Sequence, residues 1–538
     1  MSTEPVVRTT GGLVRGAMRR GVRTFTAIPY AAAVTGPARF AAPGPARRWH
    51  GVREATAPGL TAPAPRRSGF GGMDLSPVLG PGWVPPHGTG PVTGTAGSYL
   101  TVSVTTPQDQ AGGLPVLVFV HGGGLTSGTG QAALYDGASF ARHGIVVVTL
   151  NYRLGITGWL DIPGAPANRG LLDVIAALRW VAENAIAFGG DPDRVTLAGH
   201  SAGAMIVAAL LARADARGER LFARAISQSG SGLAAITAEQ ATATTQAVAR
   251  VLNVRATPEE LGGVDDRRLT QALARIGPIA LTPGGRRDTS LGDSPFQCVI
   301  DGQSLDRWPA DAVRAGRGAE VDLLIGTNRE EANLYTVPSG APATMTEAQL
   351  LAVAERRLTD PREQLDAYRA IEPTARPAEV ASRLITETFA HGSRLLTDAH
   401  AHHHRARTFA YEFAWRSSAF DGALGACHSV ELPFVFDRTD LPALHGETAL
   451  LGPLRPPAGL AERTHEAWSA FVRDGDPGWT PYDTDVRTAA VIDERWTTVN
   501  LPDPWAGSLV RAPARGTHDS SDRPILNSTD GISGALPA

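Results

Sequence analysis

The chain has 538 residues, of which 43% are hydrophobic and 19% charged, an ordinary composition for a large globular protein with a substantial core. Its formal net charge of −3 gives no basic field that would favour nucleic acid or an anionic membrane surface. The two cysteines, Cys298 and Cys427, are too few for a disulfide framework or a structural zinc site. No apolar run is long enough to span a membrane, and the N-terminus lacks the apolar segment of a secretory signal, so we expect a cytoplasmic protein.

The first part of the chain predicts strands separated by loops. Residues 5–30 alternate and turn like a small antiparallel meander. Residues 58–97 are rich in glycine and proline and predict a long surface loop. Within 98–155, the segments YLTVSVTT, LPVLVFV and GIVVVTL predict strands, the last two covered on both faces because they are continuously apolar.

From residue 168 onward, helices and strands alternate. Residues 168–188 predict a helix, with Asn168 as its N-cap, because apolar residues recur there at helical spacing. Further buried strands are expected at 194–198, 224–230, 321–331 and 407–415. This alternation of strands and helices predicts a doubly wound, mostly parallel sheet. Residues 237–285 and 345–407 have polar-faced helical patterns and predict helical insertions, whereas 508–538 predict a loosely held tail.

One motif lies between the strand at 194–198 and an apolar helix. Gly199-His200-Ser201-Ala202-Gly203 fits G-x-S-x-G, in which a sharp strand-to-helix turn exposes a serine hydroxyl and the flanking glycines allow close backbone approach. The helix that follows adds a positive dipole beside charge that develops at the serine. The motif alone is weak, but this placement favours a nucleophile over an ordinary tight turn.

A serine nucleophile needs donors for the oxyanion that forms after attack, and it also needs a base. The segment HGGGL, residues 121–125, ends a buried strand with glycines whose N–H groups are unobstructed, as in HGGG-type oxyanion loops. The acid and the base should follow in that order along the chain. Glu330 and Glu331 end a strand in GTNREEA, and His428 lies in GACHSVELPFVF. These residues are candidates, although a lone histidine is more often structural.

Taken together, these stretches resemble the type-B carboxylesterases, the branch of α/β-hydrolases that includes para-nitrobenzyl esterases, mammalian carboxylesterases and cholinesterases. The resemblance runs from about residue 7 to about residue 505 and includes LPVLVFVHGGGL, NRGLLDVIAALRWVAENAIAFGGDPDRVTLAGHSAGA, LLIGTNREEA and GACHSVELPFVF. It implies a single α/β-hydrolase domain over 1–538. That fold has a large, mostly parallel sheet, helices on both faces, helical insertions that cap the active site, and the 58–97 loop near the entrance.

The resemblance also implies roles for individual residues. Ser201 matches the nucleophile and His428 the general base. Glu331, rather than Glu330, aligns with the family acid. The oxyanion donors match Gly123, Gly124 and Ala202, and Ser229 matches a serine near the acid. No metal or cofactor is implied. The expected partner is a small-molecule ester, with the protein acting as a monomer or homodimer.

Three departures from the family pattern bear on the substrate. His200 stands where the family commonly has glutamate, which weakens any inference of a cationic substrate and leaves its role open. Leu125 follows the glycines where an aromatic residue is usual, so we expect a wider acyl side. The family's early disulfide cysteines are absent, which is consistent with an intracellular chain.

The expected activity is hydrolysis of carboxylic esters through an acyl-enzyme. Acyl transfer or lactone chemistry, amide or carbamate hydrolysis, and a non-catalytic binding role are the alternatives. His400 and His404 are spaced like a metal pair on an expected helix, but a solvated helix face explains them better, and we expect no metal.

Overall fold

A single mixed β-sheet forms the centre of the computed structural model. The structure describes residues 4–65, 71–80, 98–109, 112–213, 219–276, 295–340, 345–355, 358, 360–371, 373–501 and 504. In this part of the chain, 11 strands follow one another in the sheet in the order β16 (Thr497–Asn500), β15 (Thr488–Ile492), β14 (Thr408–Phe413), β13 (Asp322–Asn328), β10 (Arg224–Gln228), β9 (Gly190–His200), β7 (Leu114–Val120), β8 (Val146–Leu150), β6 (Thr101–Pro107), β4 (Val22–Pro29) and β3 (Ala17–Arg19).

The sheet is parallel in the middle and antiparallel at both edges. Strands from β15 to β8 pair in parallel, whereas β16 at one edge and β6, β4 and β3 at the other pair antiparallel. The antiparallel element expected over 5–30 takes the form of two hairpins in different sheets, because β1 (Val6–Thr9) pairs with β2 (Gly12–Arg15) and β3 pairs with β4. Strand β5 (Val52–Glu54) adds to β2, and β11 (Ala235–Thr237) pairs with β12 (Cys298–Ile300).

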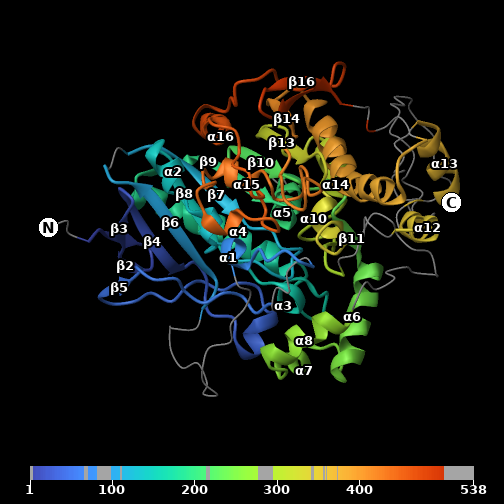
Figure 1. Ribbon diagram of the computed structural model, residues 1–538. Coiled ribbons are helices and arrows are strands. Elements are labelled where there is room, and N and C mark those ends of the chain that lie inside the picture. Colours follow the sequence, from blue (N-terminus) through green and yellow to red (C-terminus); the bar gives the residue numbers. More distant parts are fainter. Residues whose placement is uncertain are drawn as a thin grey trace, which may run out of the picture.

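Helices cover both faces of this sheet (Figure 1). Alternate residues of β7 separate the two sides, since Val118 and Val120 belong to one buried apolar cluster and Leu117 and Phe119 to another. The first cluster includes side chains of α4 (Arg169–Asn184), α5 (Ala202–Leu211), α9 (Pro309–Arg314) and α14 (Pro377–Ala401). The second includes side chains of α1 (Ser76–Leu79), α2 (Ala138–Arg142), α15 (Leu432–Val435) and α16 (Leu460–Asp474). The predicted α/β architecture, with a mostly parallel sheet between helices, is thus confirmed.

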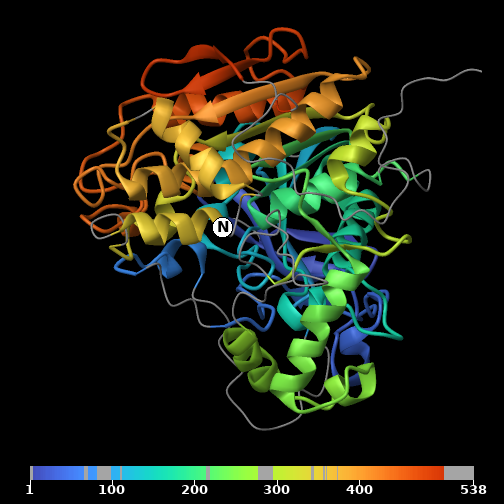
Figure 2. The same ribbon diagram turned by 90° about the vertical axis from the view of Figure 1, so that its right-hand side faces the viewer.

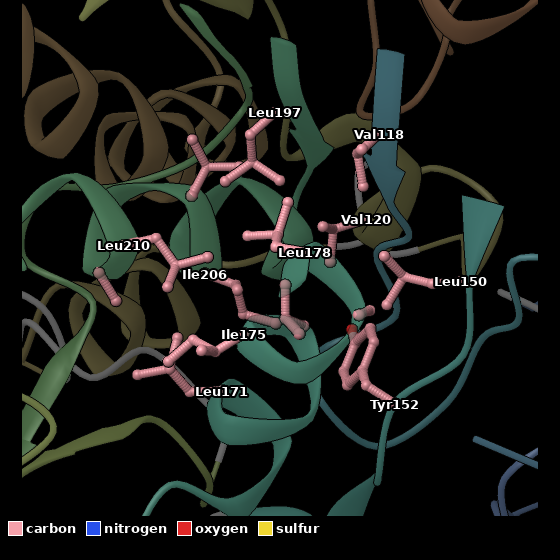
Figure 3. Close-up of a cluster of buried hydrophobic side chains, with 14 of the residues drawn as sticks. Val118, Val120, Leu150, Tyr152, Leu171, Ile175, Leu178, Leu197, Ile206 and Leu210 are labelled. Carbon is pink, nitrogen blue, oxygen red and sulfur yellow. The ribbon is translucent and has the colours of Figure 1, made fainter. Parts of the chain in front are cut away.

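The first cluster is the packing that fixes the centre of the fold. Figure 3 shows side chains of β7, β8 and β9, such as Val120, Leu150 and Leu197, lying beside those of α4 and α5. Leu178 of α4 and Ile206 of α5 are fully buried there. Burial of such side chains stabilises the fold by about 1.5–3 kcal/mol each, before the cost of ordering the chain is counted.

Two segments of helices extend beyond the sheet. The first contains α6 (Ala238–Leu252), α7 (Pro258–Gly262) and α8 (Asp266–Ile276), and the second contains α12 (Glu347–Glu355), α13 (Pro361–Ile371) and α14. In Figures 1 and 2 the first group lies below the sheet and the second beside it. The helices expected over 237–285 and 345–407 are therefore present, although 277–294 lie outside the described residues. Most of the 58–97 loop, from 66 to 70 and from 81 to 97, and the tail from 508 also lie outside them.

The sequence suggests Asn168 as the N-cap of the following helix, but its side chain does not cap that helix. It precedes α4 with φ 52°, and its side chain makes no capping bond. Instead Nδ2 donates to Val299 O at 2.7 Å and to Ser304 Oγ at 2.6 Å, while Oδ1 accepts from Val299 N. Asn168 thus joins the start of α4 to β12, a distant partner that local sequence does not reveal.

A buried ion pair links the end of β8 to α4. Arg153 and Asp173 are fully buried, with Nε 2.8 Å from Oδ2 and Nη2 2.7 Å from Oδ1. Arg153 Nη1 also donates to Ala41 O at 2.6 Å. Because both charges are paired and hydrogen-bonded, removing one partner would leave the other charge buried and uncompensated.

We therefore expect Asp173→Asn to lower the free energy of unfolding by about 3–5 kcal/mol. Glu219→Gln is the matched control, since Arg179 and Glu219 are 50% and 47% exposed and such pairs contribute less than about 1 kcal/mol. Urea unfolding of the two variants and the wild type measures both effects. Equal losses in the two variants would contradict a special role for the buried pair.

Candidate active site

The candidate residues lie where neighbouring parallel strands end. Ser201 follows β9, the glycine loop follows β7, Ser229 follows β10 and Glu331 follows β13, and these four strands are consecutive in the sheet. In open α/β sheets, sites form at the carboxyl ends of the strands, where the connecting loops meet. The fold therefore brings together residues that are more than 200 positions apart in sequence.

The turn at Ser201 has the strained backbone expected of a nucleophile at a strand-to-helix turn. Ser201 has φ 57° and ψ −123° between β9 and α5, and it is 9% exposed. A Cβ at Gly199 would overlap the backbone of Gly203, and one at Gly203 would overlap the carbonyl oxygen of Val120. Both glycines are therefore required by close approach of the backbone, which holds the strained serine in place.

The glycine loop lies directly against this serine. A Cβ on Gly122 would lie 3.0 Å from Ser201 Cβ and 2.8 Å from His200 O, so only glycine fits there. Gly123 and Gly124 have φ of 119° and 63°, and the Gly123 carbonyl is bound by Ser127 N at 3.0 Å. None of the hydrogen bonds among the described residues uses the N–H of Gly123, Gly124 or Ala202. These N–H groups are available to a ligand.

His428 and Glu331 form a buried hydrogen-bonded pair. His428 Nδ1 lies 2.6 Å from Glu331 Oε2, and the two side chains are 4% and 0% exposed. The backbone closes the same loop, because His428 N donates to Glu331 O at 3.2 Å. A carboxylate that binds Nδ1 leaves Nε2 of a neutral imidazole unprotonated, which is the form a general base needs.

Glu330, the alternative acid in the sequence, has a different environment. Its Oε2 accepts from Ala426 N at 2.9 Å and pairs with Arg416, which is about half exposed. The Glu330 backbone N–H donates to Ala426 O at 2.9 Å. Glu330 therefore fastens the loop that carries His428 to the end of β13, whereas Glu331 contacts the imidazole itself.

A second buried carboxylate, which sequence reasoning missed, lies beside this pair. Glu431 is fully buried, and Asn328 binds both acids, donating from Nδ2 to Glu431 Oε2 at 2.6 Å and from its backbone N–H to Glu331 Oε1 at 2.8 Å. Burial, and then the charge of Glu331, raise the pKa of Glu431 to about 7, against a smaller opposing effect of the Asn328 hydrogen bond. The sequence did carry a signal of this buried carboxylate, because Glu431 is the one acidic residue in the apolar stretch GACHSVELPFVF.

The remaining predicted residues lie around this centre. The His200 ring lies 4.7 Å from the His428 ring between centroids, with 36° between their planes. Ser229 is buried with φ 53°, and its N–H donates to Gly326 O at 2.8 Å. Leu125 is 3% exposed and packs in the first apolar cluster, with φ 60°. Rings of Phe389 and Tyr335, which sequence reasoning also missed, lie 5.0 and 5.7 Å from that of His428.

His400 and His404 do not lie on one face of a helix. Helix α14 ends at Ala401, and His404 lies beyond it with φ 51°. His400 is 1% exposed, not solvated, and its Nδ1 lies 2.7 Å from Thr408 Oγ1. Across the residues that the structure describes, no three His, Cys, Asp or Glu side chains gather as a metal site would need. Within the same residues, no helix has the length and apolar character needed to cross a membrane.

The fold and the strand-to-helix turn at Ser201 define an α/β-hydrolase. The chain belongs to the carboxylesterase family, whose model matches residues 3–502. It is 35% identical to phenmedipham hydrolase of Pseudarthrobacter oxydans over 89% of this chain and 91% of that protein. It is 32% identical to para-nitrobenzyl esterase of Bacillus subtilis (strain 168) over 93% and 97%.

Solved structures agree with this assignment. A thermophilic PNB esterase superposes with a TM-score of 0.77 at 31% identity, covering 93% of this chain and 98% of that one. A carboxylesterase of Geobacillus stearothermophilus gives a TM-score of 0.76 at 32% identity, covering 92% and 98%. The protein is thus a serine carboxylesterase that acts on carboxylic esters. The comparisons favour this activity over acyl transfer and over a binding role.

The raised pKa of Glu431 predicts a pH-dependent contribution to stability. The folded protein keeps a proton on Glu431 up to about pH 7, whereas the ordinary value is 4.5, so this contribution is complete below pH 4.5 and is lost as the pH rises through 7. We expect the thermal midpoint of the wild type to fall relative to that of Glu431→Gln between pH 5 and 8, by the equivalent of about 2–3 kcal/mol. A difference that moves the opposite way would show that Glu431 is ionised in the folded protein.

Proposed function

We propose that Ser201, His428 and Glu331 are the catalytic triad of this carboxylesterase. The observation that carries the proposal is the buried 2.6 Å contact between His428 and Glu331 at the same sheet edge as the strained Ser201 turn. His428 removes the Ser201 proton as the hydroxyl attacks the ester carbonyl. Glu331 holds the imidazole in orientation and stabilises its protonated form without taking its proton.

The N–H groups of Gly123, Gly124 and Ala202 hold the oxyanion of the tetrahedral intermediate. The free N–H groups and the adjoining N-terminus of α5 support this assignment. His428 then protonates the departing alcohol, leaving the acyl group on Ser201. A water molecule, deprotonated by His428, attacks the acyl-enzyme, and the carboxylic acid leaves as Ser201 recovers its proton.

We propose uncharged, medium-sized esters as substrates. The two carboxylates nearest the centre, Glu331 and Glu431, are fully buried and bound by Asn328, so neither presents a free charge to a cationic group. His200 takes the place of a family glutamate, and Phe389 and Tyr335 place apolar rings beside His428. We also propose that the helical insertions cap the substrate and that the protein is a cytoplasmic monomer or homodimer.

Replacing the nucleophile tests the triad directly. We expect Ser201→Ala to lower kcat/KM for para-nitrophenyl butyrate by at least about 10⁴-fold, and Glu331→Gln to lower it by about 10³- to 10⁴-fold. Ser469→Ala, which removes a buried serine of α16, is the matched control and should stay within about threefold of the wild type. Full activity of the Ser201 variant would refute the assignment.

The substrate class is tested by rates across a set of esters. The kcat/KM values of the wild type for para-nitrophenyl acetate, butyrate and octanoate measure the length of acyl chain that the site accepts. We expect a higher value for butyrate than for acetate. With butyrylcholine we expect at least about tenfold lower kcat/KM than with its uncharged isostere 3,3-dimethylbutyl butyrate, which has a leaving group of similar reactivity, because no free carboxylate attracts the cation. Preference for the choline ester would contradict an uncharged substrate.

A further inference from the structure

The ring of His200 lies between the glycine loop and the catalytic imidazole. His200 is 3% exposed and ends β9, one residue before Ser201. Its Nδ1 faces Gly122, where a Cβ would lie 3.1 Å away. Its Nε2 points the other way, 3.5 Å from Ser429 Oγ and 3.5 Å from Glu431 Oε1. The residue therefore contacts both halves of the site, yet the proposed reaction gives it no role.

Glu431 is surrounded mainly by donors. Gln228 Nε2 donates to its Oε1 at 3.3 Å and Asn328 Nδ2 to its Oε2 at 2.6 Å, so neither can accept a proton from it. His200, with Nε2 3.5 Å from Glu431 Oε1, can accept a hydrogen bond in its neutral form, and the same nitrogen also faces Ser429 Oγ. The titratable groups facing Glu431 come from the loops and strands around it: Glu331 after β13, Tyr411 of β14, His200 of β9, and Cys427 and His428 of its own loop.

Electrostatics disfavour a second full negative charge here below about pH 7. Two buried carboxylates bound by the same asparagine repel one another, and a second imidazolium beside His428 would meet a like charge across 4.7 Å between ring centroids. Burial and the neighbouring His428 hold the pKa of His200 well below 6.5, and burial raises that of Glu431 to about 7. The low-energy arrangement is a neutral His200 beside a protonated Glu431.

We propose that neutral His200 and protonated Glu431 act as a buried pair in which the Glu431 hydroxyl points toward His200 Nε2, 3.5 Å from Oε1. The pair leaves Glu331 as the one charged carboxylate that faces His428. This inference rests on the proposed triad, since it concerns the charge around His428. His200 is then a positioning residue, acting through Glu431 and not on the substrate.

The pair keeps a second negative charge away from His428. Without an acceptor at residue 200, the protonated Glu431 would hold a buried, unsatisfied hydroxyl, which costs about 1–3 kcal/mol and favours ionisation. The additional negative charge would stabilise the protonated His428 imidazole. The enzyme would then need a higher pH to reach half of its maximal kcat/KM.

The experiment is a pH profile of kcat/KM for para-nitrophenyl butyrate with four proteins, each corrected for active sites counted with a fluorophosphonate. His200→Phe keeps a ring against His428 but removes the acceptor, and we expect its acid-limb midpoint to rise by about 0.5–1 pH unit, a three- to tenfold change in proton affinity. Glu431→Gln mimics the protonated acid and should keep the wild-type midpoint within about 0.2 unit. The double variant should return to the wild-type midpoint, because no carboxyl group remains to ionise.

A matched control separates this effect from the loss of any buried imidazole. His400 is 1% exposed and bonds Thr408 at the amino end of β14, away from the site, so His400→Phe should leave the midpoint unchanged. If His200→Phe shifts the midpoint equally with and without Glu431→Gln, His200 acts only by packing against His428 and the pair is refuted. An unshifted His200→Phe profile refutes it as well.

A second readout does not depend on the triad. Infrared difference spectra of Ser201→Ala protein, with and without Glu431→Gln, should show a protonated-carboxyl band at pH 5 that the Gln variant lacks and that disappears as the pH passes about 7. Adding His200→Phe should lower the pH at which this band disappears. Absence of the band overturns the pair even if the esterase assignment holds, and its presence supports the pair even if Ser201→Ala keeps activity.

Discussion

The site depends on one close approach of backbone to backbone. Gly203, in the first turn of α5, lies against the carbonyl of Val120 at the end of β7, and Gly199 lies against Gly203. Any side chain there would push α5 away from the sheet. Because β7 continues into the glycine loop, the same contact sets the separation between Ser201 and the N–H groups that would hold an oxyanion. One packing constraint thus positions the proposed nucleophile and the proposed oxyanion donors together.

The other half of the site is assembled by polar contacts to one residue. Asn328 ends β13, and its backbone N–H and side-chain amide bind Glu331 and Glu431, while the amide also donates to Cys427 O at 2.8 Å. A loop about 100 residues further along the chain is thereby fastened to the sheet edge. Glu330 adds a second attachment through Ala426. The positions of the proposed acid, the proposed base and Glu431 therefore depend on how one strand ends.

Local sequence patterns predicted the parts of this structure that local physics determines. Continuous apolar runs gave the buried strands β7 and β8, and the strand–glycine–serine–glycine–helix order gave the turn at Ser201. Partners distant in sequence were not predictable, since Asn168 bonds β12 and Glu431 approaches His200 only after the sheet has formed. The choice of Glu331 over Glu330 came from family resemblance, because two adjacent glutamates look alike until their contacts are known.

Histidine at residue 200 limits the negative charge buried beside His428. The pocket beside His428 already buries Glu331 and Glu431, and a third carboxylate at this position would add repulsion or require another bound proton. A neutral imidazole has one nitrogen that accepts and one that donates, so it can accept a hydrogen bond from the Glu431 hydroxyl while its ring packs on His428. In the proposed pair the negative charge stays on Glu331, beside His428, which becomes the imidazolium in the proposed reaction. A residue next to Ser201 would then act on His428 through the protonation of Glu431, 231 positions away, and the fold rather than the motif creates this connection.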